Sequence, residues 1–407
     1  MKINKILTVC FGAALGLGLA SCADNYSYGE DRIYISGTEE DALVTFGFED
    51  TPATYSFVVS SSAKVGKDAT ISLAIDNTLV DSYNAAHGTS YTACPTGAVE
   101  LQNSSVTFTE GSATSTAATV KLISSDLLEI GPSYVIPVTI TNSDGLDVLE
   151  SSRTIYLKLS QTITFNSLDL SNYNMYAMYP FSDDKMLDMS NGYTYELKLY
   201  VDQYHGSSSG NIQRVANFEG ENESHGINLL RLGENGVTWK HLQWMSPVGA
   251  VVSNTAFQEG RWYHVALVYD GSSFSMYVDG VKEATVAGSS DTQFQWIEFG
   301  MSWTAYYRQD QRFLGRLAEV RVWNRALSTS EIASGLCAVG TNSNGLQAYW
   351  KLNEGEGYIF KDATGHGYDM DWSHSIREQW DGSGRIETDA YEYVNWKNDE
   401  TNNKCTN

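Results

Sequence analysis

Proline, cysteine and basic residues are scarce in this chain. The 407 residues include 6 Pro, 5 Cys and only 18 % charged side chains, together with 35 Gly and 25 Tyr. This composition is typical of an all-β protein. The 26 Lys and Arg are outnumbered by 49 Asp and Glu, so the net charge is −23. Such an acidic surface repels nucleic acid and anionic lipid, which argues against both as partners but is compatible with a neutral ligand such as a glycan.

Long hydrophobic runs are also missing, apart from one near the N-terminus. Residues 6–19 are apolar and follow two lysines, as in a signal peptide. Leu19-Ala20-Ser21-Cys22 then matches the bacterial lipobox. We therefore predict a lipoprotein signal peptide over 1–21, lipidation of Cys22 and a polar tether over 22–34; the alternative is an ordinary secretory signal peptide cleaved nearby. No later run approaches the roughly 20 apolar residues that a membrane-spanning helix needs.

Few cysteines are available for disulfides. Once Cys10 leaves with the signal peptide and Cys22 carries the lipid, Cys94, Cys337 and Cys405 remain. An odd number in an oxidising compartment requires a free thiol or an intermolecular bond. We predict that Cys337 pairs with Cys405, because this bond would attach a polar C-terminal tail to the domain before it. No C-x-x-C spacing suggests zinc.

The stretch from Phe313 to Ile332 combines a strand with a capped helix. Its first half alternates Leu314, Ala318, Val320 and Val322 with Glu319, Arg321 and Trp323. Ser328 and Glu331 then form the S-x-x-E capping box of a short helix. This junction resembles the late strand and helix of LamG-like domains, the concanavalin A-like lectin/glucanase jelly rolls. The segments 261–271, 276–280, 345–355 and 362–367 are similar to the same family.

A second set of strands precedes this domain. Short segments between turn residues predict strands at 55–60, 69–75, 105–109, 116–123, 134–141 and 153–159. An apolar stripe of Leu79, Val80, Tyr83 and Ala86 predicts one helix that ends at Gly88. The run from Ala74 to Pro95, with the closing strands, resembles an Ig-like domain of unknown function from surface lipoproteins of gut bacteria. In that family the domain precedes LamG-like domains or chitinase-like endoglycosidases, which implies a spacer or accessory module.

These resemblances imply an all-β fold of two domains. An Ig-like β-sandwich over residues 35–160 is followed by a concanavalin A-like (LamG) jelly roll over 165–372. The remaining tail, residues 373–407, is charged and weakly patterned. It is either a loose extension or a flap held by Cys405.

Glycosidase signatures are absent from the sequence. Jelly-roll glucanases place two or three carboxylates at alternating positions of one strand, so that all of them point into one cleft. Glu298 is alone on its predicted strand, and Asp144 to Glu150 matches the D-x-x-D-x-D-x-E pattern of chitinase-like enzymes only in part. The sequence therefore favours a protein that is not an enzyme. The alternative is a hydrolase whose carboxylates converge from different strands.

Two aromatic stretches are candidate glycan-binding sites. Sugar recognition combines flat aromatic faces with polar side chains that hold hydroxyl groups. The candidates are Trp239, His241 and Gln243 on one predicted strand face, and Trp303, Tyr306, Tyr307 and Arg308 in a connecting loop. Tyr204 and His205 form a weaker third candidate. The alternative is that these rings only pad loops over the sandwich.

One Gly-rich turn offers hard oxygen ligands. Asp362 and Asp369 lie in this turn, and jelly rolls that resemble this one sometimes hold a structural calcium ion. Both are therefore candidate calcium ligands. The alternative is a turn whose carboxylates are only solvated.

The sequence thus predicts a lipid-anchored protein of the outer membrane and the cell surface that binds an extracellular glycan. Its expected context is a polysaccharide or glycoprotein-glycan utilisation system, with surface hydrolases and a TonB-dependent transporter as partners. Two alternatives stay open: a glycoside hydrolase with dispersed carboxylates, and a non-enzymatic adhesin for a host protein.

Overall fold

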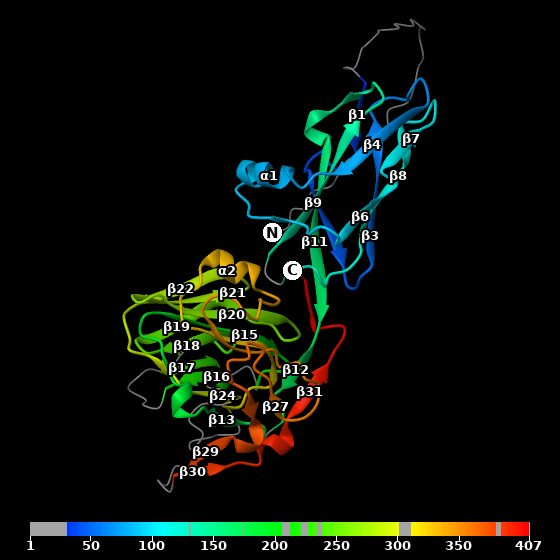
Figure 1. Ribbon diagram of the computed structural model, residues 1–407. Helices are drawn as coiled ribbons and strands as arrows, with labels where there is room; N and C mark the ends of the chain where they lie inside the picture. Colours follow the sequence, from blue (N-terminus) through cyan, green and yellow to red (C-terminus); the bar gives the residue numbers. More distant parts are fainter. Residues whose placement is uncertain are drawn as a thin grey trace, which may run out of the picture.

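The chain forms two β-sandwiches that follow each other in the sequence (Figure 1). The computed structural model describes residues 31–129, 132–172, 174–205, 212–220, 227–233, 238–300, 311–379 and 384–406. Each sandwich encloses its own hydrophobic core, with Val59 and Leu157 in the first and Phe218 and Val320 in the second. The all-β prediction is confirmed. In the described ranges, no helix has the length and apolar character needed to cross a membrane.

The first domain packs two sheets face to face. One sheet has the order β10–β1–β3–β8–β6, with bounds Asp147–Val148, Arg32–Ile35, Ala53–Ser61, Thr114–Leu122 and Val99–Gln102. The other has the order β2–β11–β9–β4–β7, with bounds Leu43–Phe48, Thr154–Thr164, Tyr134–Asn142, Ala69–Ile75 and Ser105–Phe108, and β5 (Thr92–Ala93) lies beside β9. Alternation drives this packing: in β8, Ala118, Val120 and Leu122 are fully buried, whereas Thr119 and Lys121 between them are not.

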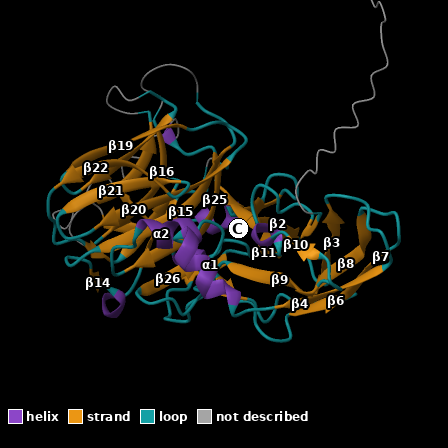
Figure 2. Ribbon diagram, turned by 90° about the horizontal axis from the view of Figure 1, so that it is seen from above, coloured by secondary structure: helices purple, strands orange, loops and turns teal. Residues whose placement is uncertain are grey.

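The helix α1 (Leu79–His87) packs on the outside of the first domain. It buries Val80 and Tyr83, and the Tyr83 ring lies 4.3 Å from that of Tyr156 in β11. The helix ends at Gly88, whose φ of 65° is the left-handed conformation that glycine adopts readily. The predicted helix and its C-terminal cap are therefore confirmed. Figures 1 and 2 place α1 near the junction between the two domains.

The second domain is built from two larger sheets. The first jelly-roll sheet has the order β22–β21–β20–β15–β25–β12–β31, with β26 beside β25; the bounds are Val281–Ala287, Ser273–Val278, Trp262–Tyr269, Tyr193–Val201, Gly315–Trp323, Asn166–Asp169, Asn395–Asn398 and Leu346–Trp350. The second jelly-roll sheet has the order β19–β18–β17–β16–β24–β13–β29–β30; the bounds are Gly249–Ala256, His241–Ser246, Ile227–Leu232, Gln213–Glu219, Trp296–Phe299, Ala177–Pro180, Ile376–Gln379 and Gly384–Glu387. Short pairs join β14 (Leu187–Asp188) to β23 (Gln293–Phe294) and β27 (Ile359–Phe360) to β28 (Met370–Asp371). The two large sheets share one core, in which Tyr195 stacks on Phe218 at 4.4 Å.

Strand β25 lies inside the first jelly-roll sheet, between β15 and β12, and is followed by helix α2 (Thr329–Ser334). Val320 and Val322 face the shared core, while Trp323 packs on the opposite side with residues of α2. The Ser328 hydroxyl accepts a hydrogen bond from the Glu331 N–H, and the Glu331 carboxylate accepts one from the Ser328 N–H. The capping box predicted from the sequence is therefore confirmed, and it fixes where the helix begins.

A buried ionic network lies on the α2 side of this sheet. Arg321, which is 0 % exposed, donates to Glu319 at 2.6 Å, to the Gly335 carbonyl at 2.8 Å and to Glu196 at 3.5 Å. The Trp323 indole N–H also donates to Glu196, at 2.7 Å. Glu319 adopts a φ of 55°, which is uncommon for a residue other than glycine, at a bulge between β15 and β25. The network therefore holds a strained backbone position in place.

The C-terminal tail contributes strands to both domains. β29 and β30 extend the second jelly-roll sheet, and β31 pairs with β12 in the first. β32 (Lys404–Thr406) pairs with Thr162–Thr164 at the end of β11, a strand of the first domain. Cys337 and Cys405 form a disulfide with their Cα atoms 5.5 Å apart. The tail is therefore a flap that is tied to both domains, and not a loose extension.

Candidate functional site

Polar side chains gather on the outer face of the second jelly-roll sheet. In β16, β17, β18 and β24, most inward side chains are apolar: Val215, Phe218, Leu230, Leu232, Leu242, Trp244, Ile297 and Phe299. The inward Asn228 is polar, and its side-chain oxygen accepts hydrogen bonds from the Tyr193 hydroxyl and the Trp244 indole N–H. The outward side chains include Arg214, Asn217, Glu219, Arg231, Gln243 and Glu298, which we call the polar face. A bulge in β16 between Arg214 and Ala216 keeps Arg214 and Asn217 on the same side of the sheet.

Two carboxylates of the polar face share one amide. The Asn217 side-chain nitrogen donates to Glu219 at 2.7 Å and to Glu298 at 2.8 Å. An amide nitrogen carries two hydrogens, so each carboxylate takes one of them. Both accepting oxygens lie within hydrogen-bond distance of the same nitrogen, so the distance between them cannot exceed the sum of the two nitrogen–oxygen distances. Glu298, alone on its strand in the sequence, thus has a second carboxylate as its neighbour.

Guanidinium groups lie on the same face of the sheet as this carboxylate pair. Arg231 donates from Nε to Gln243 at 2.7 Å, and Arg214 donates from Nε to Gln311 at 2.9 Å. All six residues of the polar face are at most 9 % exposed. Arg214, Arg231 and both glutamates also make further contacts. The result is a set of planar donors and acceptors held in fixed directions.

Trp239 lies at the rim of this sheet and not on its polar face. β18 begins only at His241, so Trp239 falls in the preceding turn, where it packs against the shared core. Its ring meets Tyr204 edge-on at 4.5 Å, and the Lys240 ammonium lies 4.7 Å from the ring centre. Trp239 is only partly buried. Two candidates that were separate in the sequence, Trp239 and Tyr204, are therefore neighbours.

The other predicted site residues are distributed as follows. His241 Nδ1 lies 2.9 Å from the Ser253 carbonyl, and Gln243 belongs to the polar face. Trp303, Tyr306, Tyr307 and Arg308, as well as Cys22, lie outside the described residues. The described residues that flank the aromatic stretch adjoin the polar face: β24 ends just before Gly300, and Arg312 forms a β-bridge with Arg214.

The two candidate calcium ligands accept hydrogen bonds from backbone groups of their own turn and of the adjacent strand β26. Asp362 accepts from the backbone N–H groups of Tyr349 (3.2 Å), Thr364 (3.0 Å) and Tyr368 (3.2 Å). Asp369 accepts from the Asp362 N–H at 2.8 Å and pairs with a lysine at 2.7 Å. Across the described ranges, no group of three or more His, Cys, Asp or Glu residues is arranged to hold a metal ion. The Asp362 carboxylate links this turn to β26 through these hydrogen bonds.

Sequence reasoning missed Asn217, Glu219 and Arg231. Asn217 and Glu219 alternate with apolar residues in β16, which was a usable signal on its own. The bulge interrupts that alternation after Arg214, and Arg231 follows two leucines without any motif. Their convergence with Glu298 depends on the order of strands in the sheet.

Comparison with known families agrees with this geometry. Residues 174–333 match the family model described as the concanavalin A-like lectin/glucanases superfamily. The second domain is concanavalin A-like. Residues 26–147 match the model of a family of N-terminal domains. No curated protein is similar enough to count as a match.

Solved structures give one informative similarity. A Bacteroides ovatus protein, provisionally described as carbohydrate-binding, is 24 % identical, with a TM-score of 0.55 over 82 % of this chain and 94 % of its own. EndoBT-3987 of Bacteroides thetaiotamicron, solved with a Man5GlcNAc product, is 17 % identical over 32 % of this chain and 30 % of its own, with a TM-score of 0.27. A domain of a Geobacillus stearothermophilus arabinanase, solved with arabinotriose, is 17 % identical over 42 % of this chain and 96 % of its own, also with a TM-score of 0.27. Only the first similarity supports the fold.

Proposed function

We propose that this protein binds a glycan at the polar face and its rim. The observation that carries the proposal is the convergence of Asn217, Arg231 and Gln243 on one face of a concanavalin A-like sheet. Sugar hydroxyls both donate and accept hydrogen bonds, so planar amides and guanidinium groups suit them. Among the described residues, no group donates to Asn217 Oδ1, although this atom is buried. It is an unsatisfied acceptor, which a sugar hydroxyl would reach once the residues that bury it move aside.

The rim supplies the apolar part of such a site. Trp239 and Tyr204 form an aromatic pair, and the half-buried Trp239 ring is accessible where the sheet residues are not. A sugar ring stacks its C–H surface on an aromatic face, while its hydroxyls reach polar side chains nearby. The predicted aromatics Trp303 and Tyr306 belong to the chain segment whose flanking residues adjoin the same face. The Bacteroides ovatus relative, described as carbohydrate-binding, supports this proposal.

Replacing Trp239 with alanine should weaken glycan binding about thirtyfold, since loss of an aromatic hot spot typically costs about 2 kcal/mol. Trp303→Ala should have a similar effect. Gln243→Met, which keeps the side-chain volume but removes the amide, should cost about tenfold. A glycan array identifies the ligand, and isothermal titration calorimetry then gives the affinity of each variant.

The control for these variants is Trp323→Ala. Trp323 is 3 % exposed and bonded to Glu196, so this change should lower stability by about 3–5 kcal/mol. Trp239→Ala should shift the melting temperature much less. If Trp239→Ala and Trp303→Ala destabilise the protein as strongly as the control, both rings belong to the core and the binding site lies elsewhere.

A second candidate function, glycoside hydrolysis, is favoured by the carboxylate pair. Glu219 and Glu298 are held by the same Asn217 nitrogen, and retaining glycosidases need two carboxyl groups about 5–5.5 Å apart. The test is release of reducing sugar from a glycan that the protein binds. Hydrolysis that is lost in both Glu219→Gln and Glu298→Gln would establish this function. Binding without hydrolysis would leave glycan capture as the activity.

We also propose that Cys22 is acylated and anchors the protein in the outer membrane, facing the cell exterior. The lipobox and the apolar run before it support this proposal. The captured glycan would then pass to surface hydrolases and a TonB-dependent transporter. In cells, Cys22→Ala should move the protein from the membrane to the soluble fraction. A variant that stays with the membrane after a high-salt wash would show that the anchor is something else.

A further inference from the structure

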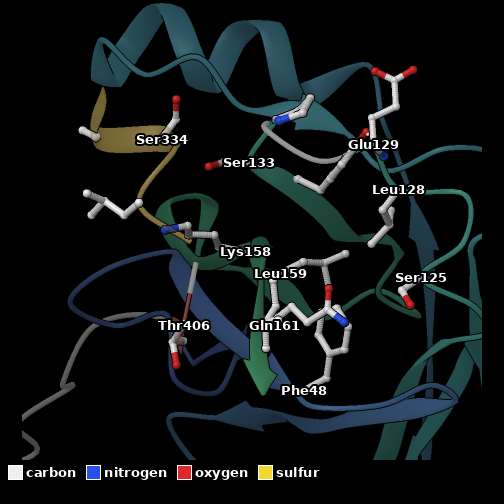
Figure 3. A pocket seen from close by; sticks show the side chains of 15 residues that line it. Phe48, Ser125, Leu128, Glu129, Ser133, Lys158, Leu159, Gln161, Ser334 and Thr406 are labelled. Atoms are coloured by element: carbon white, nitrogen blue, oxygen red, sulfur yellow. The ribbon is translucent and has the colours of Figure 1, made fainter. Parts of the chain in front are cut away.

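A pocket lies at the junction between the two domains (Figure 3). Its volume is about 450 Å³, within the range of small-molecule sites. The first domain contributes Lys158, Leu159 and Gln161 of β11 and the neighbouring Ser133. The second domain contributes Ala333 and Ser334 at the end of α2, and Leu336 in the loop that follows. The pocket is therefore complete only when both domains are in place.

The junction is held in a fixed arrangement by the tail. β32 pairs with β11 from Thr162 to Thr164, and the Cys337–Cys405 disulfide ties β32 to the loop after α2. The pocket-lining residues Leu336 and Thr406 are the direct chain neighbours of these two cysteines. A pocket between domains joined by a single linker would open and close as they move. This pocket is already formed without a ligand, so binding does not require the loss of conformational entropy that ordering the two domains would cost.

One positive charge projects into the pocket. Lys158 is partly buried, and within the described ranges its ammonium has no carboxylate within salt-bridge distance. In Figure 3 this ammonium extends toward the α2 side of the pocket, whereas the carboxylate of Glu129 points away from it. Ser133 and Ser334 lie on the same side, and the Ser334 hydroxyl donates to the Glu331 carbonyl at 3.0 Å, which leaves its oxygen free to accept. In a chain of net charge −23, such an unpaired cation beside hydroxyls marks a place for an anion.

We propose that this pocket binds a carboxylated sugar, such as a hexuronate residue. The carboxylate would accept charge-assisted hydrogen bonds from Lys158, and the sugar hydroxyls would meet Ser133, Ser334 and Gln161. Leu159 and Leu336 supply an apolar surface for the C–H face of the ring. This site lies at the domain junction, is separate from the polar face, and takes an acidic ligand where the polar face takes a hydroxyl-rich one.

The test uses the mature, oxidised protein and titration calorimetry with D-glucuronate, with D-glucose as the uncharged probe. The wild type should bind glucuronate and not glucose. Lys158→Gln should weaken glucuronate binding about tenfold or more, because a hydrogen bond to a charged group is lost. Lys158→Arg, which keeps the charge, should retain binding. Lys64→Gln is the matched control, since it removes the same charge from an exposed loop of the same domain.

A second experiment removes the disulfide between Cys337 and Cys405. The Cys337→Ser/Cys405→Ser double variant should bind glucuronate more weakly, because β32 and the loop after α2 are no longer joined at the pocket. The proposal is overturned if the wild type binds none of glucuronate, galacturonate and N-acetylneuraminate at millimolar concentration. It is also overturned if Lys158→Gln and Lys64→Gln bind equally well. Circular dichroism checks that Lys158→Gln is folded. If it is not, the test passes to Lys158→Arg, and a folded Lys158→Arg variant that does not bind glucuronate contradicts the proposal.

Discussion

Replacing Arg321 with alanine should lower the free energy of unfolding by about 3–5 kcal/mol, the usual cost of removing one partner from a buried ionic network. Arg321 is 0 % exposed and bonds to Glu319 and Glu196, which are 8 % and 1 % exposed. Without the guanidinium, both carboxylates would remain buried without their main counter-charge. Urea unfolding followed by tryptophan fluorescence measures the loss, since Trp323 donates to Glu196 in the same network.

The loss in Arg321→Ala should depend on pH. Burial by itself would raise the pKa of Glu196, but Arg321, His264 and Trp323 together hold it below its ordinary value. In the wild type, the contribution of Glu196 is therefore present above its unfolded pKa and is lost as the pH falls. In the variant, burial should raise the pKa of Glu196, so protonation relieves the unpaired charge. The stability difference should thus be largest near neutral pH and shrink toward pH values of about 4.

The matched control is Arg325→Ala. Arg325 pairs with Glu331 at 2.7 Å, but their side chains are 30 % and 44 % exposed. An exposed pair of this kind contributes only about 0–1 kcal/mol. Equal destabilisation by the two substitutions would contradict the importance of the buried network.

Removing the Cys337–Cys405 disulfide should lower the free energy of unfolding by roughly 2–4 kcal/mol, because the bond closes a long loop in the unfolded chain. The two cysteines are 68 residues apart in the sequence. Unfolding of the Cys337→Ser/Cys405→Ser variant should match that of the wild type in reductant. Limited proteolysis should then cut the tail near Asp399, since β32 keeps only its short pairing with β11 and the exposed ion pair between Lys404 and Glu49.

Thiol titration provides the control for this result. In the described part of the chain, Cys94 is the free cysteine; it is buried, and burial raises the pKa of its thiol to about 11. The unfolded, oxidised mature protein should therefore show one reactive thiol besides any contributed by position 22. Three thiols, or a wild-type stability that reductant does not change, would be inconsistent with the disulfide.

Features that depend on neighbouring residues could be read directly from the sequence. The alternation in β25 and the capping box at Ser328 and Glu331 involve groups within a few residues of each other. The same holds for α1, whose buried Val80 and Tyr83 and terminal Gly88 lie within three turns of helix. The order of strands and turns then resembled known domains closely enough to indicate two β-sandwiches, which the structure confirms.

The candidate site was only partly predictable, because its parts come from different strands. Gln243 was identified from its own strand, but the assignment of Trp239 to the same face was wrong, since the strand begins two residues later. Backbone hydrogen bonding to β17 and β19 sets that starting point, and the local pattern of aromatic and polar residues contains no sign of it. The ring consequently packs against Tyr204 at the rim.

By itself, the sequence determined the all-β class, the acidic surface, the capped helix after β25 and the outline of two domains. Only the tertiary structure decided that Glu219 and Glu298 share Asn217, that the tail joins both domains through β32, and that Lys158 faces a pocket at their junction. Each of these contacts depends on which strands become neighbours and on bulges that shift their register. Strand order and register are set by packing over the whole core, so no single segment of the chain encodes them.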